Sequence, residues 1–263
     1  MQASGIITLL TDFGSRDAYV GIMKGVALGI CPAARLVDLT HEVPPQAVRV
    51  GALLLRSALG YFPDGTVHLA VVDPGVGSAR NPVAVLGERA ILVGPDNGLL
   101  APAATALGSF VVRRLTCQQL FRRPVSATFH GRDVFAPVAA HLAAGMAADE
   151  LGPELPALEA LDLPAPRVDP HAVHGEVIYV DHFGNLITNI DAAAVATFRQ
   201  QTVSVSISKT MMSPLAASYA AVPPGAPLAL IGSWGLLEVA VRDGNAAAAL
   251  RAGLATPVIV TGE

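Results

Sequence analysis

The sequence predicts an α/β protein built from an amino-terminal layered α/β domain with a central sheet and a smaller, mostly antiparallel β domain. Two observations support this prediction. Strand and helix patterns alternate over roughly the first 150 residues, as they do in layered α/β domains. After a proline-rich segment the pattern changes to short β-branched runs between turn residues. We therefore expect domains at residues 1–155 and 172–263, joined by a linker over 156–171.

Apolar runs without polar alternation predict the strands of the amino-terminal domain, because buried strands of α/β sheets are apolar on both faces. The expected strands are Ile6–Leu10, Arg35–Leu39, His68–Val72, Pro82–Leu86 and Ala90–Val93. Helical spacing of apolar residues predicts helices at Asp17–Ile30, Ala47–Leu59 and Phe135–Ala148. The first helix is expected to end at Cys31-Pro32, since proline does not continue a helix.

The carboxyl-terminal domain is predicted from short, β-branched segments that turn residues separate. These segments are Gly175–Val180, Leu186–Ile190, Val203–Ile207, Pro227–Ile231, Leu236–Val241 and Pro257–Val260. The segment before them, Gly152–Pro170, contains five prolines and scattered acidic residues, which is typical of a connection between domains.

Composition narrows the classes of partner. The 263-residue chain has a net charge of −4 and no cluster of Lys or Arg, so we expect no nucleic-acid partner. Charged residues make up only 14% of the chain, against 52% hydrophobic residues, which favours an oligomer that buries part of its exterior. No apolar run reaches membrane-spanning length, and the first residues lack a signal-peptide pattern, so we expect a cytoplasmic protein without membrane contact.

The stretch Val71–Arg80, V-V-D-P-G-V-G-S-A-R, is the first candidate for chemistry. Asp73 directly follows a buried strand, where open α/β sheets place their ligand crevice. Arg80 lies in the same loop, and His130 comes from the second loop F-H-G-R-D. An acid, a cation and an imidazole together could bind and polarise a water molecule. The alternative is an ion pair in a loop and one hydrogen-bonded histidine.

Other kinds of catalytic site lack their sequence signals. Acids and histidines occur on several loops, but no H-x-H, D-x-D or H-E-x-x-H pair is present, so we expect no catalytic metal. The chain has no G-x-S-x-G nucleophile motif and no Walker lysine. Its two cysteines, Cys31 and Cys117, are too few for a disulfide framework or a zinc site.

Two motifs of the carboxyl-terminal domain suit a nucleoside. In D-H-F-G-N, Phe183 could stack on an adenine face and Asn185 could bond to its edge. Ser233 precedes Trp234-Gly235 in the second motif. The alternative is that these residues only form turns and that Phe183 packs into the core.

Six motifs follow one another in an order that resembles one known family. They are T-D-F-G, V-V-D-P-G-V-G, G-P-D-N-G, F-H-G-R-D, D-H-F-G-N and G-S-W-G-L-L-E-V-A, beginning at residues 11, 71, 94, 129, 181 and 232. The chain resembles the S-adenosyl-L-methionine (SAM) hydrolases, also called SAM hydroxide adenosyltransferases, which are relatives of the fluorinases and chlorinases. The resemblance covers nearly the whole chain.

The resemblance implies a homotrimer, with each active site between the large domain of one subunit and the small domain of its neighbour. The family triad would be Asp73, Arg80 and His130. Asp12 would hold the ribose hydroxyls, and Asp181 and Ser233 would face the amino and carboxylate groups of methionine. The remaining implied substrate contacts are Phe129, Phe183, Asn185, Tyr219, Glu238 and Ala246.

Departures from the fluorinases indicate which reaction to expect. Fluorinases have tyrosine in place of Asp73, a halide-holding serine in place of Gly131 and arginine in place of Trp234. We therefore expect hydrolysis of SAM to adenosine and L-methionine, by in-line attack of an activated water on the ribose 5′ carbon, without a cofactor. The alternatives are a chlorinase-like halogenase and a non-catalytic protein that binds SAM or adenosine. The sequence leaves open whether Asp73 or His130 is the base.

Overall fold

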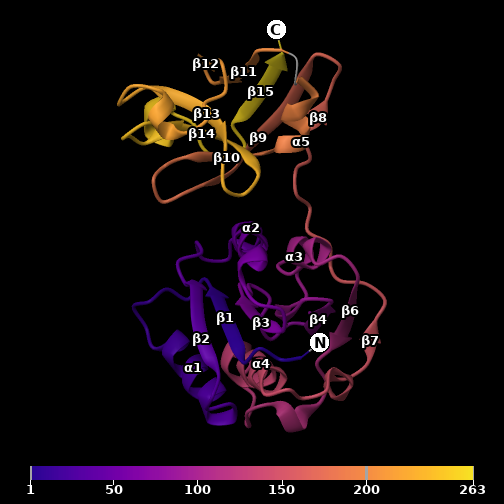
Figure 1. The fold of residues 1–263 in the computed structure, drawn as a ribbon. Helices are drawn as coiled ribbons and strands as arrows, with labels where there is room; N and C mark the ends of the chain where they lie inside the picture. The colour runs from indigo at the N-terminus through magenta and orange to yellow at the C-terminus, as the bar shows by residue number, and fades with distance from the viewer. Residues whose placement is uncertain (1, 199–200, 263) are drawn as a thin grey trace. The chain divides into compact units, whose positions relative to one another are not determined.

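The structure is a computed structural model that describes residues 2–198 and 201–262. The chain divides after Asp162 into two compact units (Figure 1). Each unit has its own hydrophobic core. Within the described residues, no helix combines the length and the apolar character that crossing a membrane requires.

A seven-stranded mixed sheet forms the centre of the first unit, in the order β2-β1-β3-β5-β4-β6-β7. Its strands are β1 (Ile6–Thr11), β2 (Arg35–Thr40), β3 (Thr66–Val71), β4 (Pro82–Gly87), β5 (Ala90–Pro95), β6 (Phe110–Arg114) and β7 (Glu154–Leu155). Strands β2, β1, β3 and β5 run parallel, whereas β4, β6 and β7 pair antiparallel. The five strands expected in this unit are confirmed, and β6 and β7 were not expected.

Helices cover both faces of this sheet (Figure 1). They are α1 (Tyr19–Ile30), α2 (Val48–Ala58), α3 (Ala101–Ala106) and α4 (Ala136–Ala143). Helices α1 and α4 pack against one another over the core that contains Leu9, Leu69 and Val71, and α2 packs with α3. Strand β3 is buried along its whole length, as its continuous apolar run predicts.

The expected helix Phe135–Ala148 is wrong at both ends. A π-helical turn at Gly131–Phe135 precedes α4, so Phe135 belongs to that turn. At the other end Gly145 has a φ of 93°, its N–H donates to the Leu142 carbonyl, and the Met146 N–H donates to the His141 carbonyl. These two hydrogen bonds form a Schellman motif, which ends the helix after Ala143.

The second unit is an antiparallel sheet in the order β12-β11-β15-β9-β10-β14-β13, with β8 paired to β9. Its strands are β8 (Arg167–Val168), β9 (Ala172–Val180), β10 (Leu186–Asp191), β11 (Val203–Ile207), β12 (Thr210–Met212), β13 (Pro227–Ile231), β14 (Leu236–Val241) and β15 (Pro257–Gly262). The end strands β12 and β13 also contact each other, so the sheet is nearly closed into a barrel. Two short helices, α5 (Ala192–Val195) and α6 (Ala246–Leu250), accompany it.

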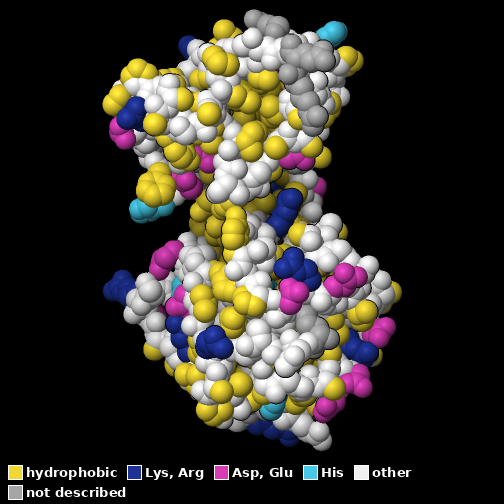
Figure 2. Space-filling view, viewed as in Figure 1, with side chains coloured by type: hydrophobic (Ala, Val, Ile, Leu, Met, Phe, Trp, Pro, Cys, Tyr) yellow, Lys and Arg dark blue, Asp and Glu magenta, His cyan; other side chains and the backbone are white. Residues whose placement is uncertain are grey.

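The exterior carries few charges for its area. Figure 2 shows apolar side chains reaching the surface of both units, with charged side chains scattered between them. Several large apolar side chains of α1 are among the exposed ones, namely Tyr19, Ile22 and Leu28. This agrees with the low charge content of the sequence.

Candidate active site

The loop after β3 is held at an edge of the sheet where several predicted site residues meet. Strands β1 and β3 are parallel neighbours, so Asp12 and Asp73, which follow them, lie at the same edge. The G-P-D-N-G turn supports this loop from β5, because Asn97 Nδ2 donates to the Val72 carbonyl over 2.9 Å. Gly98 has a φ of 90°, as the turn prediction requires.

Close packing fixes the same loop against the segment that precedes His130. Gly77 has a φ of 78°, and a Cβ atom added there would lie 2.6 Å from the Ala127 carbonyl oxygen. Only glycine combines that conformation with such a close approach. The glycine therefore lets the loop of Asp73 and Arg80 lie directly beside the loop of His130.

The structure brings Asp73, Arg80 and His130 into direct contact. Arg80 Nε donates to Asp73 Oδ1 over 3.0 Å, and Arg80 Nη2 donates to Asp73 Oδ2, which makes a bidentate pair. The same Nη2 lies 2.8 Å from His130 Nδ1. The side chains of Asp73 and Arg80 are only 5% and 9% exposed. The predicted triad is thus a connected group in which the side chains of Asp73 and Arg80 are buried and His130 is half-buried.

The protonation state of His130 follows from this contact. Burial lowers the pKa of His130 and the Arg80 charge lowers it further, against smaller opposing effects of Asp73 and Asp133. Because arginine only donates, His130 Nδ1 accepts, and the proton of the neutral ring lies on Nε2. The ring of Phe135 supports the group, with the Arg80 guanidinium 5.3 Å from its centre.

Asp133 is a buried support that sequence analysis missed. Arg132 donates to it twice, Nε to Oδ1 over 2.7 Å and Nη2 to Oδ2 over 2.8 Å, and the Ser126 N–H donates to Oδ2 over 2.8 Å. Burial would raise the pKa of Asp133, but the Arg132 bonds and the Ser126 N–H outweigh it and lower the pKa. Asp133 therefore ties the two ends of the segment 126–132, which contains His130. An adjacent Arg-Asp pair was the only sequence signal.

An aromatic cluster lies beside the triad loops. The ring centres of Phe13 and Phe129 are 5.9 Å apart, and the centre of Tyr19 is 5.2 Å from that of Phe129 and 6.0 Å from that of Phe13. Gly131 is buried next to this cluster. A Cβ atom added at Gly131 would lie 3.1 Å from Met23 Sδ and 3.3 Å from Phe13 Cε2. The neighbouring side chains therefore leave little room for a side chain at this position.

The second unit contains a cavity of about 1030 Å³. Six of the predicted substrate residues line it: Asp181, Phe183, Asn185, Tyr219, Ser233 and Glu238. Ala246 does not line it, and is buried at the start of α6. Trp234, Arg242 and Asn245 also line the cavity, and the Trp234 ring stacks on Tyr179 with centres 5.3 Å apart. Sequence analysis offered no signal for Arg242 and Asn245 beyond their place in a polar turn.

The D-H-F-G-N motif is organised by its aspartate. Asp181 Oδ1 accepts the N–H groups of Phe183 and Asn185 over 2.9 and 2.8 Å, and Oδ2 accepts from Asn185 Nδ2 over 2.9 Å. Asp181 therefore shapes the turn. The alternative prediction that Phe183 packs into the core is wrong, because Phe183 is 70% exposed and lies outside the core.

Glu238 and Tyr219 form a coupled pair in the cavity wall. The Tyr219 hydroxyl donates to Glu238 Oε1 over 2.6 Å. Burial raises the pKa of Glu238, and burial together with Glu238 raises the pKa of Tyr219 to about 12. The pair therefore offers the cavity an acidic group whose orientation the tyrosine fixes.

Comparison with known proteins agrees with these features. Residues 7–152 match the SAM hydroxide adenosyltransferase N-terminal domain, and residues 175–259 match its C-terminal domain. An (R)-S-adenosyl-L-methionine hydrolase of Thermus thermophilus is 44% identical over 93% of this chain and 94% of its own length. One of Salinispora arenicola is 42% identical over 94% of each chain. A fluorinase of an Actinoplanes species is more distant, at 29% identity over 91% of this chain and 92% of its own.

A solved structure gives the same result for the fold. An uncharacterized conserved protein from Thermotoga maritima superposes with a TM-score of 0.92 and 36% identity, covering 97% of this chain and 99% of its own. Both domain models, the relatives along nearly the full length and the ordered motifs agree. The chain therefore belongs to the SAM hydroxide adenosyltransferase family.

Proposed function

We propose that this protein hydrolyses S-adenosyl-L-methionine to adenosine and L-methionine, and that its substrate is the (R) epimer at sulfur. The observation that carries the proposal is the connected group of Asp73, Arg80 and His130, with Asp73 and Arg80 buried, in a chain of this family. The epimer is suggested by the relatives, which are named (R)-S-adenosyl-L-methionine hydrolases.

The reaction makes few demands on a site. The oxygen of water forms a bond to the ribose 5′ carbon, while the bond from that carbon to the sulfonium breaks and its electron pair stays on sulfur. Methionine then leaves as a neutral thioether, which needs no general acid. The site must hold a water in line with the breaking bond and accept one proton from it. No other co-reactant is required, so we propose that the enzyme works without metal or cofactor.

The hydrogen bonds of the triad favour Asp73 as the group that accepts the proton. The single lone pair of His130 Nδ1 is already directed at Arg80, and its Nε2 carries the ring proton. Each oxygen of Asp73 accepts one bond from Arg80 and has capacity for another. We assign Arg80 the stabilisation of the developing hydroxide, and His130 the role of a neutral donor at Nε2.

The cavity of the second unit is the proposed place for the nucleoside and methionine. Phe183 is exposed enough to stack on adenine, and Asn185 offers an amide to its edge. We assign Asp181 and Ser233 to the amino acid groups of the substrate. The remaining proposed contacts are Phe129, Tyr219, Glu238 and Ala246, with Asp12 on the ribose hydroxyls.

Assembly into a homotrimer, with sites shared between subunits, is part of the proposal. Its support is that the triad lies in the first unit and the cavity in the second, so a complete site needs both. The exposed apolar side chains of α1 and the low charge content also favour a subunit interface. Light scattering on active protein tests this, and an active monomer would contradict it.

The test of the function is incubation with SAM that contains both epimers, in heavy-oxygen water. We expect adenosine and methionine in equal amounts, label in the 5′ hydroxyl of adenosine, unlabelled methionine and preferential loss of the (R) epimer. Free adenine or methylthioadenosine as the main product would refute the proposed position of attack. Unchanged SAM with a raised melting temperature would instead support a binding protein. In the presence of chloride, 5′-chloro-5′-deoxyadenosine would support the halogenase alternative.

A further inference from the structure

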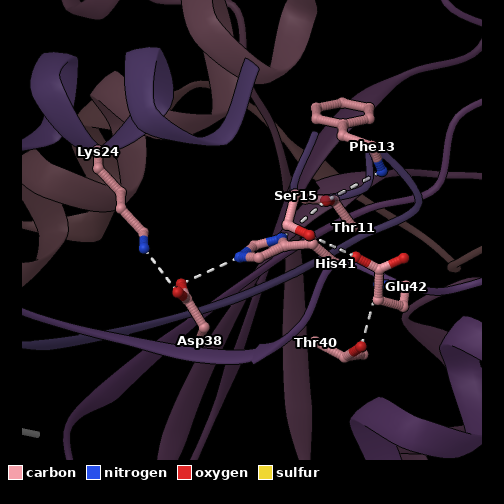
Figure 3. A network of polar contacts seen from close by, with 8 residues as sticks. All are labelled: Thr11, Phe13, Ser15, Lys24, Asp38, Thr40, His41 and Glu42. Carbon is pink, nitrogen blue, oxygen red and sulfur yellow. Dashed lines mark hydrogen bonds and ion pairs between the residues drawn. The ribbon is translucent and has the colours of Figure 1, made fainter. Parts of the chain in front are cut away.

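We infer that His41 is a positioning residue, which acts through Asp12 to hold the nucleoside. The inference rests on the proposed function for the role of Asp12, and on the hydrogen bonds around His41 for the rest. His41 is a buried histidine in the loop after β2, outside the triad and the cavity. Figure 3 shows it between Thr11 and Asp38, in a network that reaches Lys24.

The carboxylate of Asp38 sets the direction of the hydrogen bonds at His41. Lys24 Nζ donates to Asp38 Oδ2 over 2.6 Å. Burial would raise the pKa of Asp38, but its contacts with Lys24 and His41 outweigh burial and lower the pKa. His41 Nε2 lies 3.0 Å from Asp38 Oδ1, within ion-pair distance although not in hydrogen-bonding geometry. A carboxylate favours the tautomer whose proton lies on the nitrogen beside it, here Nε2, and in that tautomer Nδ1 is an acceptor. We assign this tautomer, in which the Thr11 hydroxyl donates to Nδ1 over 2.9 Å.

His41 thereby holds the backbone on both sides of Asp12. The hydrogen of the Thr11 hydroxyl is directed at His41, and its oxygen accepts the Phe13 N–H over 3.2 Å. The His41 carbonyl accepts the Gly14 N–H over 2.8 Å. We call the paired segments 11–15 and 41–46 the clasp. Both the side chain and the backbone of His41 belong to it.

Two further bonds of the clasp reach past His41. The Ser15 hydroxyl donates to Glu42 Oε1 over 2.8 Å, and the Gln46 N–H donates to Asp12 Oδ2 over 2.8 Å. Gln46 has a φ of 65°, a conformation that costs energy for a residue with a side chain. Because the Gln46 N–H donates to Oδ2, the other oxygen of Asp12, Oδ1, can accept a hydrogen bond from a ligand. The clasp therefore sets the direction of the carboxylate that is assigned to the ribose.

A second histidine in the same unit shows what a purely structural role looks like. His68 Nδ1 lies 2.8 Å from Thr8 Oγ1, much as His41 Nδ1 lies against Thr11, but this pair spans neighbouring strands in the sheet interior. Within the described residues, neither Thr8 nor His68 makes a side-chain hydrogen bond to the clasp. Substitutions at Thr8 and His68 are therefore matched controls for the same changes at Thr11 and His41.

The experiment is a double-mutant cycle between the clasp and Asp12. Thr11→Val and His41→Leu are each made in the wild type and in Asp12→Ala, next to Thr8→Val and His68→Leu. The dissociation constant of adenosine and the KM and kcat for SAM are measured. We expect each clasp variant to weaken adenosine binding about 3- to 10-fold, the range for one lost hydrogen bond, and to change KM more than kcat. In the Asp12→Ala background the same substitutions should weaken adenosine binding by less than about 2-fold, because their effect passes through Asp12.

Hydrogen exchange of the ligand-free protein adds a readout that does not depend on turnover. The amides of Phe13 and Gly14 should exchange faster in Thr11→Val and His41→Leu, and at the wild-type rate in Thr8→Val and His68→Leu. Unchanged exchange at Phe13 and Gly14 would overturn the inference, and so would equal losses of adenosine affinity with and without Asp12. A wild type that binds adenosine but leaves SAM intact would refute the proposed function, and the adenosine cycle would still decide the role of His41.

Discussion

His68 makes the stability of the first unit sensitive to acid. Its side chain is fully buried in β3, and its Nε2 finds no hydrogen-bond partner among the described residues. Burial lowers its pKa from 6.5 to about 4. The unfolded chain therefore binds a proton more readily than the folded chain at any pH between these values. The stability that the neutral ring provides is complete above pH 6.5 and is lost as the pH falls toward 4.

The size of the effect follows from the two pKa values. Each pH unit between them corresponds to about 1.4 kcal/mol in the free energy of unfolding. With values of 6.5 and about 4, the linkage relation gives a loss of about 2 kcal/mol between pH 7 and pH 5, and about 3 kcal/mol in total at lower pH. Replacing the histidine by a residue that does not titrate should remove this part of the pH dependence.

The assay compares wild type and His68→Leu at pH 7 and pH 5. The only tryptophan, Trp234, lies in the second unit, so its fluorescence does not report on β3. Native-state hydrogen exchange of the β3 amides gives the free energy of opening of the first unit instead. We expect wild type to lose about 2 kcal/mol more than His68→Leu between the two pH values. Equal losses in both proteins would show that His68 is not held neutral by burial.

The remaining predictions concern the active site. Asp73→Asn should lower kcat about 10²- to 10⁴-fold with little change in adenosine affinity, and near-normal turnover would refute its assignment as proton acceptor. Because the pKa of His130 is lowered, kcat/KM should stay constant through pH 6.5, the ordinary pKa of histidine, and decline only at lower pH, where the ring protonates and loses its bond from Arg80. A wild-type pH profile without that acid decline would contradict this. Gly131→Ser should destabilise the protein by about 1–3 kcal/mol in urea unfolding, since its Cβ crowds Met23 and Phe13, and should not produce a chlorinated nucleoside. Dialysis against a strong chelator should leave turnover unchanged, and activity restored by added metal would overturn the proposed water activation.

Elements whose sequence patterns are local could be predicted without the structure. The continuous apolar run before Asp73 predicts a strand buried on both faces, and β3 has that environment. Asp12 and Asp73 were placed at strand ends from the same signal. Strand β6 was not predicted because Phe110–Arg114 is mostly exposed and ends in two arginines. Its burial pattern is neither continuous nor alternating. The ordered motifs identified the family without any knowledge of contacts.

The contacts among the site residues could not be predicted from local patterns, because they form between segments that are distant in the chain. Arg80 lies 7 residues from Asp73 and 50 from His130 in the chain, yet it donates to both, and this fixes the tautomer of the histidine. Thr11 and His41 are 30 residues apart and meet in the clasp. Ala246 follows Asn245 directly in the chain, yet Asn245 lines the cavity and Ala246 is buried outside its lining. Hydrogen bonds and burial of this kind depend on the packing of segments that are distant in the chain. A sequence pattern records the local preference of each segment, and the geometry between segments arises only when they pack together.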